Sequence, residues 1–146
     1  MLTVRNSIHI AASPEDVFAF MDEPARQTSF TPHLQQSDEV ERLENGGARA
    51  RYRYDLYGWG LDGEVRATDY VPPERIIWAM SGDLQGTIRW YVDPEDDGSR
   101  LTYAATYTVP GPALLRPLLT PAVRRFNEKE VHRLLHNVKA SLEARR

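Results

Sequence analysis

Residues 48–59 read ARARYRYDLYGW. From position 48 to position 56, small, aromatic or aliphatic side chains alternate with charged ones. Because successive side chains of a β-strand point to opposite faces, this period of two predicts a strand with one buried and one solvated face. The predicted inner face carries Ala50, Tyr52, Tyr54 and Leu56, and the outer face carries Arg49, Arg51, Arg53 and Asp55.

Strand signals continue on both sides of this segment. Residues 45–47 (NGG), 72–73 (PP) and 95–98 (EDDG) are turn signals, and short turns join antiparallel neighbours. The sequence therefore predicts an antiparallel sheet of six or seven strands. Besides residues 48–59, the predicted strands are residues 2–11, 40–44, 61–70, 76–80, 86–93 and 101–109.

Helix signals lie near the two ends of the chain. Ser13 and Pro14 suit the N-cap and first turn of a short helix, and a second short helical or looped segment is expected over residues 25–36. Thr120 and Pro121 predict the start of a long C-terminal helix. Its apolar stripe would pack on the sheet, which gives a two-layer α+β domain. The stripe consists of Val131, Leu134, Leu135, Val138 and Leu142.

Length and composition indicate one domain spanning residues 1–146. The chain is 41% hydrophobic and 27% charged, with no cysteine and a net charge of -3. The lack of cysteine removes disulfides, thiolate catalysis and cysteine-based zinc sites. No apolar run approaches the ~20 residues of a membrane span, and the first residues lack the apolar core of a signal peptide. We expect a cytoplasmic protein with no cofactor, no nucleic-acid partner and no stable membrane insertion.

Aromatic side chains dominate the predicted inner face of the sheet. An ordinary core would favour Val, Ile and Leu, whereas buried Tyr and Trp need hydrogen-bond partners. Simple core packing is the alternative for any one of them, but as a group they favour an apolar pocket with a few polar points. The candidate ligand-binding residues from the strands are Tyr52, Tyr54, Trp78, Met80, Trp90, Tyr103 and Tyr107.

The long helix adds three candidates. Steps of ~100° place Arg124 and Asn127 on the stripe that continues through Val131. An inward Arg124 could hold a carboxylate, phosphate or enolate oxygen with its planar fork. A solvated helix end is the alternative, and a phase shift at Pro121 would turn Arg124 outward. Phe126 falls off the stripe and is expected at the mouth of the cavity or displaced by that shift.

Other chemistry-bearing patterns favour structural interpretations. Glu128, His132 and His136 have helical spacing that could bind a metal, but nearby basic residues indicate a solvated helix face. His9 and His33 are isolated in the sequence. We therefore expect no metal site. The sequence also contains no Ser-His-Asp spacing and no glycine-rich phosphate loop.

Three short segments of the sequence resemble segments of a known superfamily. They are IHIAASPEDVF (residues 8–18), DYVPPERI (69–76) and SRLTY (99–103). With the order of elements, they resemble the START-like helix-grip (SRPBCC) superfamily, in its polyketide cyclase/dehydrase and lipid-transport branch. Phe30-Thr31-Pro32 is similar to the Phe-x-Pro of coenzyme Q-binding relatives, which adds Phe30 to the candidate site. The resemblance implies a curved sheet around the last helix, two short helices after the first strand and an internal cavity.

Three functions follow from the pocket and the resemblance. The first is binding of a small hydrophobic or aromatic molecule, such as a lipid, quinone or polyketide, in the cavity. The second is polyketide aromatase/cyclase activity without a cofactor, which needs proton transfer at a held carbonyl. Its candidate donors and acceptors are Tyr52, Tyr54, Tyr103 and Arg124. The third is a protein-interaction module, supported by residues 30–32. Homodimer formation is left open.

Overall fold

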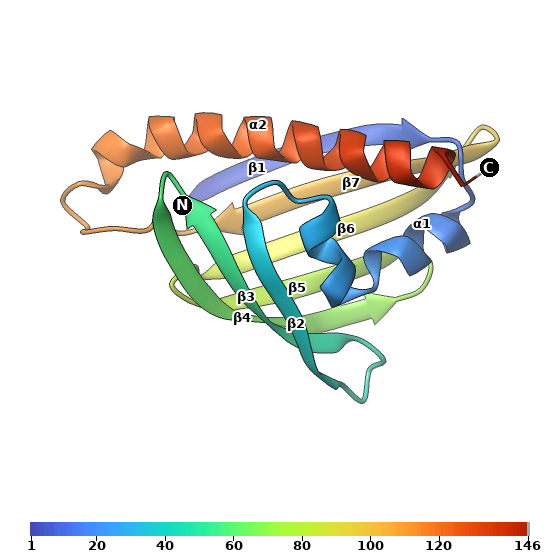
Figure 1. The fold of residues 1–146 in the computed structure, drawn as a ribbon, viewed down its shortest axis with the longest axis horizontal. Helices are drawn as coiled ribbons and strands as arrows, with labels where there is room; N and C mark the ends of the chain where they lie inside the picture. The colour runs from blue at the N-terminus through green and yellow to red at the C-terminus, as the bar shows by residue number, and fades with distance from the viewer. Residues whose placement is uncertain (146) are drawn as a thin grey trace.

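A seven-stranded antiparallel sheet curves around one long helix (Figure 1). The computed structural model describes residues 1–145. The strand order is β1-β7-β6-β5-β4-β3-β2, so the first and last strands pair and the other neighbours are consecutive hairpins. The elements are β1 (Leu2–Ile10), α1 (Pro14–Met21), η1 (Pro24–Ser29), β2 (Leu34–Arg42), β3 (Ala48–Leu56), β4 (Trp59–Val71), β5 (Arg75–Gly82), β6 (Gly86–Glu95), β7 (Gly98–Tyr107) and α2 (Arg116–Glu143).

The alternation in β3 predicted its two faces correctly. Ala50, Tyr52 and Leu56 are buried, whereas Arg51 and Arg53 are exposed. On the outer face, Arg53 pairs with Asp62 of β4 at 3.1 Å, and Arg75 of β5 pairs with Asp69 at 2.6 Å. Arg49 also pairs with Glu41 and Glu64, so two of the three arginines on the outer face of β3 have acidic partners on neighbouring strands.

The expected strand at residues 40–44 has different limits. β2 runs over Leu34–Arg42 and forms an edge of the sheet. Only Ser37 is buried within it, so the strand lacks the apolar alternation that would have shown its start. The segment expected to be helical or looped over residues 25–36 divides into the 3-10 helix η1 and the beginning of β2.

The N-terminus of α1 forms as its sequence predicts. Ser13 is the N-cap, and its hydroxyl accepts a hydrogen bond from the backbone N–H of Asp16 at 3.2 Å. Pro14 occupies the first turn, where its missing N–H costs nothing. In Figure 1, α1 lies beside the C-terminal end of α2, with which it is in contact.

The long helix α2 begins four residues before the predicted Thr120. The backbone N–H groups of Leu118 and Leu119 both donate to the carbonyl of Leu115 at 3.0 Å, which forms a turn ahead of Pro121. Thr120 is thus inside the helix, where its hydroxyl donates to the carbonyl of Arg116 at 2.7 Å instead of capping. The predicted stripe is confirmed, since all five of its residues are buried. Within residues 1–145, no helix is both long and apolar enough to cross a bilayer.

Candidate functional site

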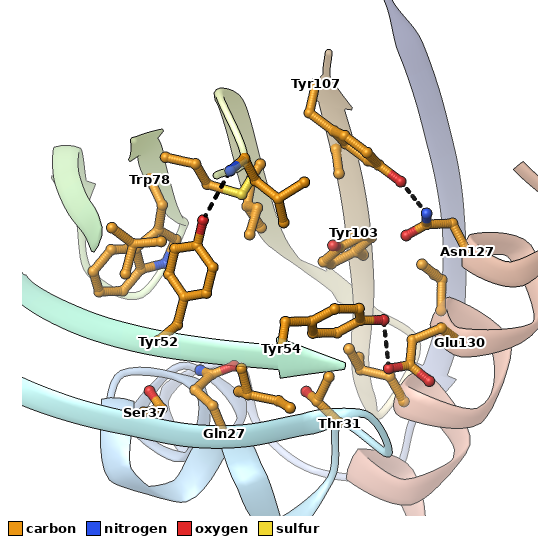
Figure 2. Close-up of a pocket in the computed structure, with 18 of the residues that line it drawn as sticks. Gln27, Thr31, Ser37, Tyr52, Tyr54, Trp78, Tyr103, Tyr107, Asn127 and Glu130 are labelled. Atoms are coloured by element: carbon orange, nitrogen blue, oxygen red, sulfur yellow. Dashed lines mark hydrogen bonds between the residues drawn. The ribbon is translucent and has the colours of Figure 1, made fainter. Parts of the chain in front are cut away.

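A cavity of about 140 Å³ lies between the concave face of the sheet and α2 (Figure 2). Strands β2 to β7, η1 and α2 contribute its walls, and most of the lining is aromatic or aliphatic. An apolar cavity of similar size, ~150 Å³, is large enough to bind benzene. The cavity lining includes these sequence-predicted residues: Tyr52, Tyr54, Trp78, Met80, Trp90, Tyr103, Tyr107, Asn127 and Val131.

Small residues among the large rings leave the space open. Ala105 of β7 lines the cavity between Tyr103 and Tyr107 along the same strand face. Gly63 of β4 pairs directly with Tyr52, and a Cβ at Gly63 would overlap the Tyr52 ring and the backbone oxygen of Ser81. The Tyr52 hydroxyl donates to that oxygen at 3.4 Å and accepts the N–H of Leu84 at 3.3 Å. The missing side chain of Gly63 therefore gives Tyr52 its position in the wall.

The polar centre of the cavity is Glu130, which sequence reasoning missed. Its side chain is 4% exposed, on the inner face of α2. Three donors reach the carboxylate: the Tyr54 hydroxyl at 2.7 Å, the backbone N–H of His33 at 3.0 Å and His33 Nδ1 at 2.8 Å. The spacing to Leu134 and Val138, two successive i+4 steps, was a signal for an inward Glu130. The partner His33 was expected to be isolated, and it lies 97 positions away in the sequence.

The tyrosine hydroxyls in the cavity are held in their neutral form. Burial raises the pKa of Tyr54 well above its ordinary range, and the neighbouring Glu130 charge raises it further. Burial also raises the pKa of Tyr103 and Tyr107. Tyr107 accepts a hydrogen bond from the side-chain amide of Asn127. No hydrogen-bond partner for the Tyr103 hydroxyl occurs within residues 1–145, so a donor is available inside the cavity.

Two candidate residues lie outside the cavity. Arg124 was expected on the inner stripe, but it is exposed and donates to the backbone oxygen of Thr3 at 3.1 Å. Val123, 5% exposed, takes the inner position instead. Phe30, also expected at the site, lies instead in the core. It is 1% exposed, and its ring centroid is 5.6 Å from that of Phe20.

Phe126 belongs to an aromatic cluster next to the cavity. Its ring centroid lies 4.7 Å from that of His33 and 4.9 Å from that of Tyr57. Tyr57 is at the turn between β3 and β4, and its hydroxyl donates to the backbone oxygen of Ala122 at 3.0 Å. The cluster thus connects the β3–β4 hairpin to the N-terminal half of α2. It also contacts the imidazole of His33, which binds Glu130.

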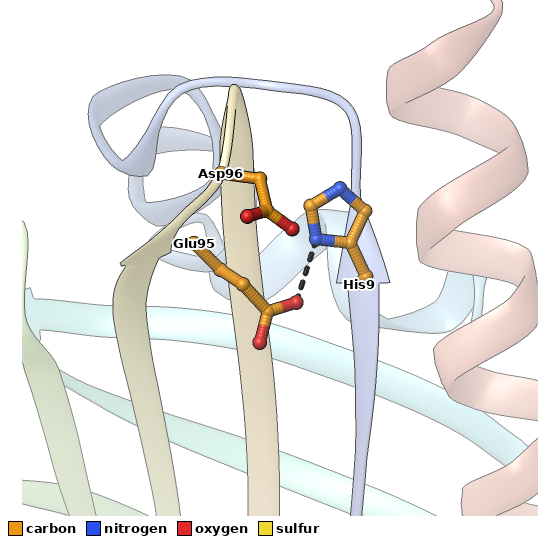
Figure 3. A group of neighbouring side chains, drawn as sticks. All are labelled: His9, Glu95 and Asp96. Atoms are coloured by element: carbon orange, nitrogen blue, oxygen red, sulfur yellow. Dashed lines mark hydrogen bonds and ion pairs between the residues drawn. The ribbon is translucent and has the colours of Figure 1, made fainter.

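A second group of titratable side chains lies away from the cavity (Figure 3). His9, Glu95 and Asp96 have ligand atoms close enough together to hold a metal ion. Glu95 already binds His9 Nδ1 at 2.7 Å and the guanidinium of Arg100 at 2.5 Å, and the Arg100 contact lowers the pKa of Glu95. A cation would have to displace or face that guanidinium. We therefore interpret the group as an ion-pair network that joins β1, β6 and β7.

The fold and the cavity define a START-like helix-grip protein. The family model described as "Polyketide cyclase / dehydrase and lipid transport" matches residues 1–143, and the chain belongs to that family. No curated protein matches the sequence significantly.

Solved structures show the same fold at low sequence identity. A protein from Thermus thermophilus superposes with a TM-score of 0.87 at 20% identity, covering 98% of each chain. A START superfamily protein from Mycobacterium smegmatis gives 0.76 at 14% identity, covering 99% of each chain. The Zhui aromatase/cyclase from a Streptomyces species gives 0.73 at 19% identity, covering 99% of this chain and 94% of that one. These likenesses establish the fold, which hosts several functions.

Proposed function

We propose that the protein binds a small hydrophobic or aromatic molecule in the cavity between the sheet and α2. The observation that carries this proposal is the aromatic-lined cavity of about 140 Å³ with a hydroxyl donor, that of Tyr103, left without a partner among residues 1–145. That hydroxyl can donate a hydrogen bond to a ligand oxygen, which the apolar side chains of the wall cannot do. Membership of the polyketide cyclase/dehydrase and lipid transport family agrees with an apolar ligand.

Titration with N-phenyl-1-naphthylamine, a neutral apolar fluorophore, tests the proposal. We expect saturable fluorescence enhancement and quenching of Trp78 and Trp90, which line the cavity. Ala105→Phe should fill the cavity and weaken probe binding at least tenfold. The control Thr68→Ala, on an exposed position of β4, should bind like the wild type. Failure of the wild type to bind either the probe or benzene, which a cavity of this size can hold, would refute the proposal. Unchanged probe binding by a folded Ala105→Phe variant would refute it as well.

The identity of the natural ligand requires a separate measurement. Native mass spectrometry of protein purified from its own host should reveal a bound lipid, quinone or polyketide. The same spectrum gives the number of chains per particle, which tests homodimer formation.

Cyclase activity is a second candidate, and the contact between Tyr54 and Glu130 favours it. A carboxylate in hydrogen-bond contact with a cavity hydroxyl can take a proton, and Tyr103 can donate to a carbonyl oxygen. The aromatase/cyclase from Streptomyces shares the fold. Incubation with a poly-β-ketone thioester should give an aromatic absorbance that Glu130→Gln abolishes.

The third candidate, a protein-interaction module, has less support. Its sequence motif was Phe30-Thr31-Pro32. Phe30 is buried in the core, and its backbone oxygen accepts a hydrogen bond from Asn137 of α2 at 2.9 Å. The motif therefore serves to attach the segment after η1 to the helix.

A further inference from the structure

We propose that the cavity selects apolar ligands that carry a neutral hydroxyl group, a phenol or an alcohol, over carboxylates of the same skeleton. The selecting element is the hydrogen-bonded pair of Tyr54 and Glu130. This inference rests on the proposed ligand-binding function and adds the chemical class of the ligand.

The charge inside the cavity has one sign. Among the residues that line it, Glu130 is the only acidic side chain, and neither Arg nor Lys is present. The imidazole of His33 contacts Glu130, but it is 35% exposed and does not belong to the lining. Arg124, the expected anion anchor, is outside the cavity. An anionic ligand would therefore meet a carboxylate and no cation in the cavity wall.

Placing a carboxylate ligand near Glu130 costs much free energy, because most of the cavity wall is apolar. Two like charges interact more strongly in an apolar interior than in water, because little solvent screens them. A carboxylate ligand would also lose its own hydration. It would bind in its protonated form, and its affinity would fall as the pH rises above its ordinary pKa.

A ligand hydroxyl group, in contrast, finds hydrogen-bond partners in the cavity wall. The Tyr54 hydroxyl donates its hydrogen bond to Glu130 at 2.7 Å, so its oxygen can accept a hydrogen bond from a ligand. Tyr103, also in the lining, has a hydroxyl that can donate to a ligand oxygen. A ligand hydroxyl can donate and accept, whereas a carboxylate can only accept. The cavity therefore supplies both partners that an alcohol or phenol needs.

Competition experiments with three compounds of one skeleton test the proposal. Naphthalene, 2-naphthol and 2-naphthoic acid would displace N-phenyl-1-naphthylamine from the intact protein at neutral pH. We expect 2-naphthol to bind at least tenfold more tightly than 2-naphthoate. Because ionised naphthoate is also better hydrated, the diagnostic quantity is how this ratio depends on Glu130.

Two variants and one matched control measure that dependence. Glu130→Gln keeps the shape of the side chain and removes its charge, so the naphthol-to-naphthoate ratio should fall at least fivefold. Glu128→Gln loses the same charge on the exposed face of α2 and should leave the ratio unchanged. Tyr54→Phe should reduce the advantage of naphthol over naphthalene by about three- to tenfold, the value of one hydrogen bond. If Glu130→Gln does not fold, Tyr54→Phe still tests whether the pair of Tyr54 and Glu130 favours a ligand hydroxyl.

The outcomes separate the two proposals. If neither N-phenyl-1-naphthylamine nor benzene binds, ligand binding itself is refuted. If the probe binds but naphthoate competes as well as naphthol, or if folded Glu130→Gln and Tyr54→Phe leave both ratios unchanged, the hydroxyl preference alone is overturned.

Discussion

At the scale of single residues, Glu130 requires the most explanation. A carboxylate taken out of water costs several kcal/mol unless donors surround it. Here the backbone of residue 33, the imidazole of His33 and the hydroxyl of Tyr54 supply those donors. All three belong to β3 or the segment just before β2, so the carboxylate joins α2 to the edge of the sheet. Removing one of these donors should therefore lower the free energy of unfolding, because the buried carboxylate would lack a partner.

His33→Ala tests this cost. The substitution removes the imidazole that contacts Glu130 and keeps the backbone N–H contact. We expect the free energy of unfolding to fall by about 1–3 kcal/mol, since a buried acceptor is left short of one partner. Urea unfolding followed by circular dichroism measures the change. His132→Ala, on the exposed face of α2, should change stability by less than about 0.5 kcal/mol. Equal stability of the two variants would contradict the role of His33.

Gly63 is a second single residue on which the cavity depends, because it sets the shape of the wall. Gly63→Ala would push its Cβ against the Tyr52 ring and the backbone of Ser81. We expect a loss of about 1–3 kcal/mol of stability, as for overpacked cores, together with weaker binding of N-phenyl-1-naphthylamine. Gly60→Ala is the matched control in the same strand. Its Cβ would meet only the end of the flexible Arg53 side chain, which can move aside. A Gly63→Ala protein with wild-type stability and binding would show that the wall adjusts freely.

At the scale of elements, strands were easier to predict than the helix. The period of two in β3 fixes which side chains point inward, because each step reverses the face. The inner positions of Tyr52 and Tyr54 follow from it directly. The inner face of a helix is inferred from the apolar spacing along it, and extending that face beyond the apolar residues relies on regular steps of ~100°. Extended back from Val131, those steps placed Arg124 inward, where the structure buries Val123 instead, whereas Val131 and the apolar positions after it are buried as predicted.

Pro121, inside the same helix, carries its own prediction. Proline inside a helix removes one backbone hydrogen bond and crowds the preceding turn. Pro121 lies inside α2 and is exposed. Pro121→Ala should therefore raise the free energy of unfolding by about 1–2 kcal/mol, after allowance for the greater entropy of the unfolded chain.

Pro117→Ala provides the comparison for this prediction. Pro117 is in the first turn of α2, where a missing N–H leaves nothing unsatisfied. We expect this variant to be neutral or slightly destabilised. Thermal unfolding of the two variants side by side measures the difference. A Pro121→Ala protein that melts below the wild type would indicate that the proline fits a bend in α2 that alanine does not maintain.

At the scale of the whole molecule, the cavity depends on contacts that no local pattern reveals. His33 and Glu130 come together only because β2 and α2 border the same cavity, although 97 positions separate them. Periodicity predicts which face of an element is buried, but not which element lies opposite. The sheet, the helix and most lining residues could therefore be predicted, whereas the contact between His33 and Glu130 could not.

The buried tyrosines give the whole molecule a characteristic response to alkali. Of the seven tyrosines, five have a raised pKa in the folded protein, with burial as the largest cause in each. The pKa of Tyr70, whose hydroxyl donates to Asp22 at 2.7 Å, rises to about 12. The five residues are Tyr52, Tyr54, Tyr70, Tyr103 and Tyr107.

The sign of the effect follows from linkage. A phenol with a raised pKa in the folded state binds its proton more tightly there than in the unfolded chain. The stability it contributes is complete below the ordinary pKa of ~10 and is lost as the pH rises through the folded value. We therefore expect the protein to unfold in alkali, with absorbance at 295 nm and circular dichroism changing together well above pH ~10. In urea, all tyrosines should titrate near their ordinary pKa. Ionisation of most tyrosines near that value in a protein that keeps its circular dichroism would mean that the cavity admits hydroxide and is open to water.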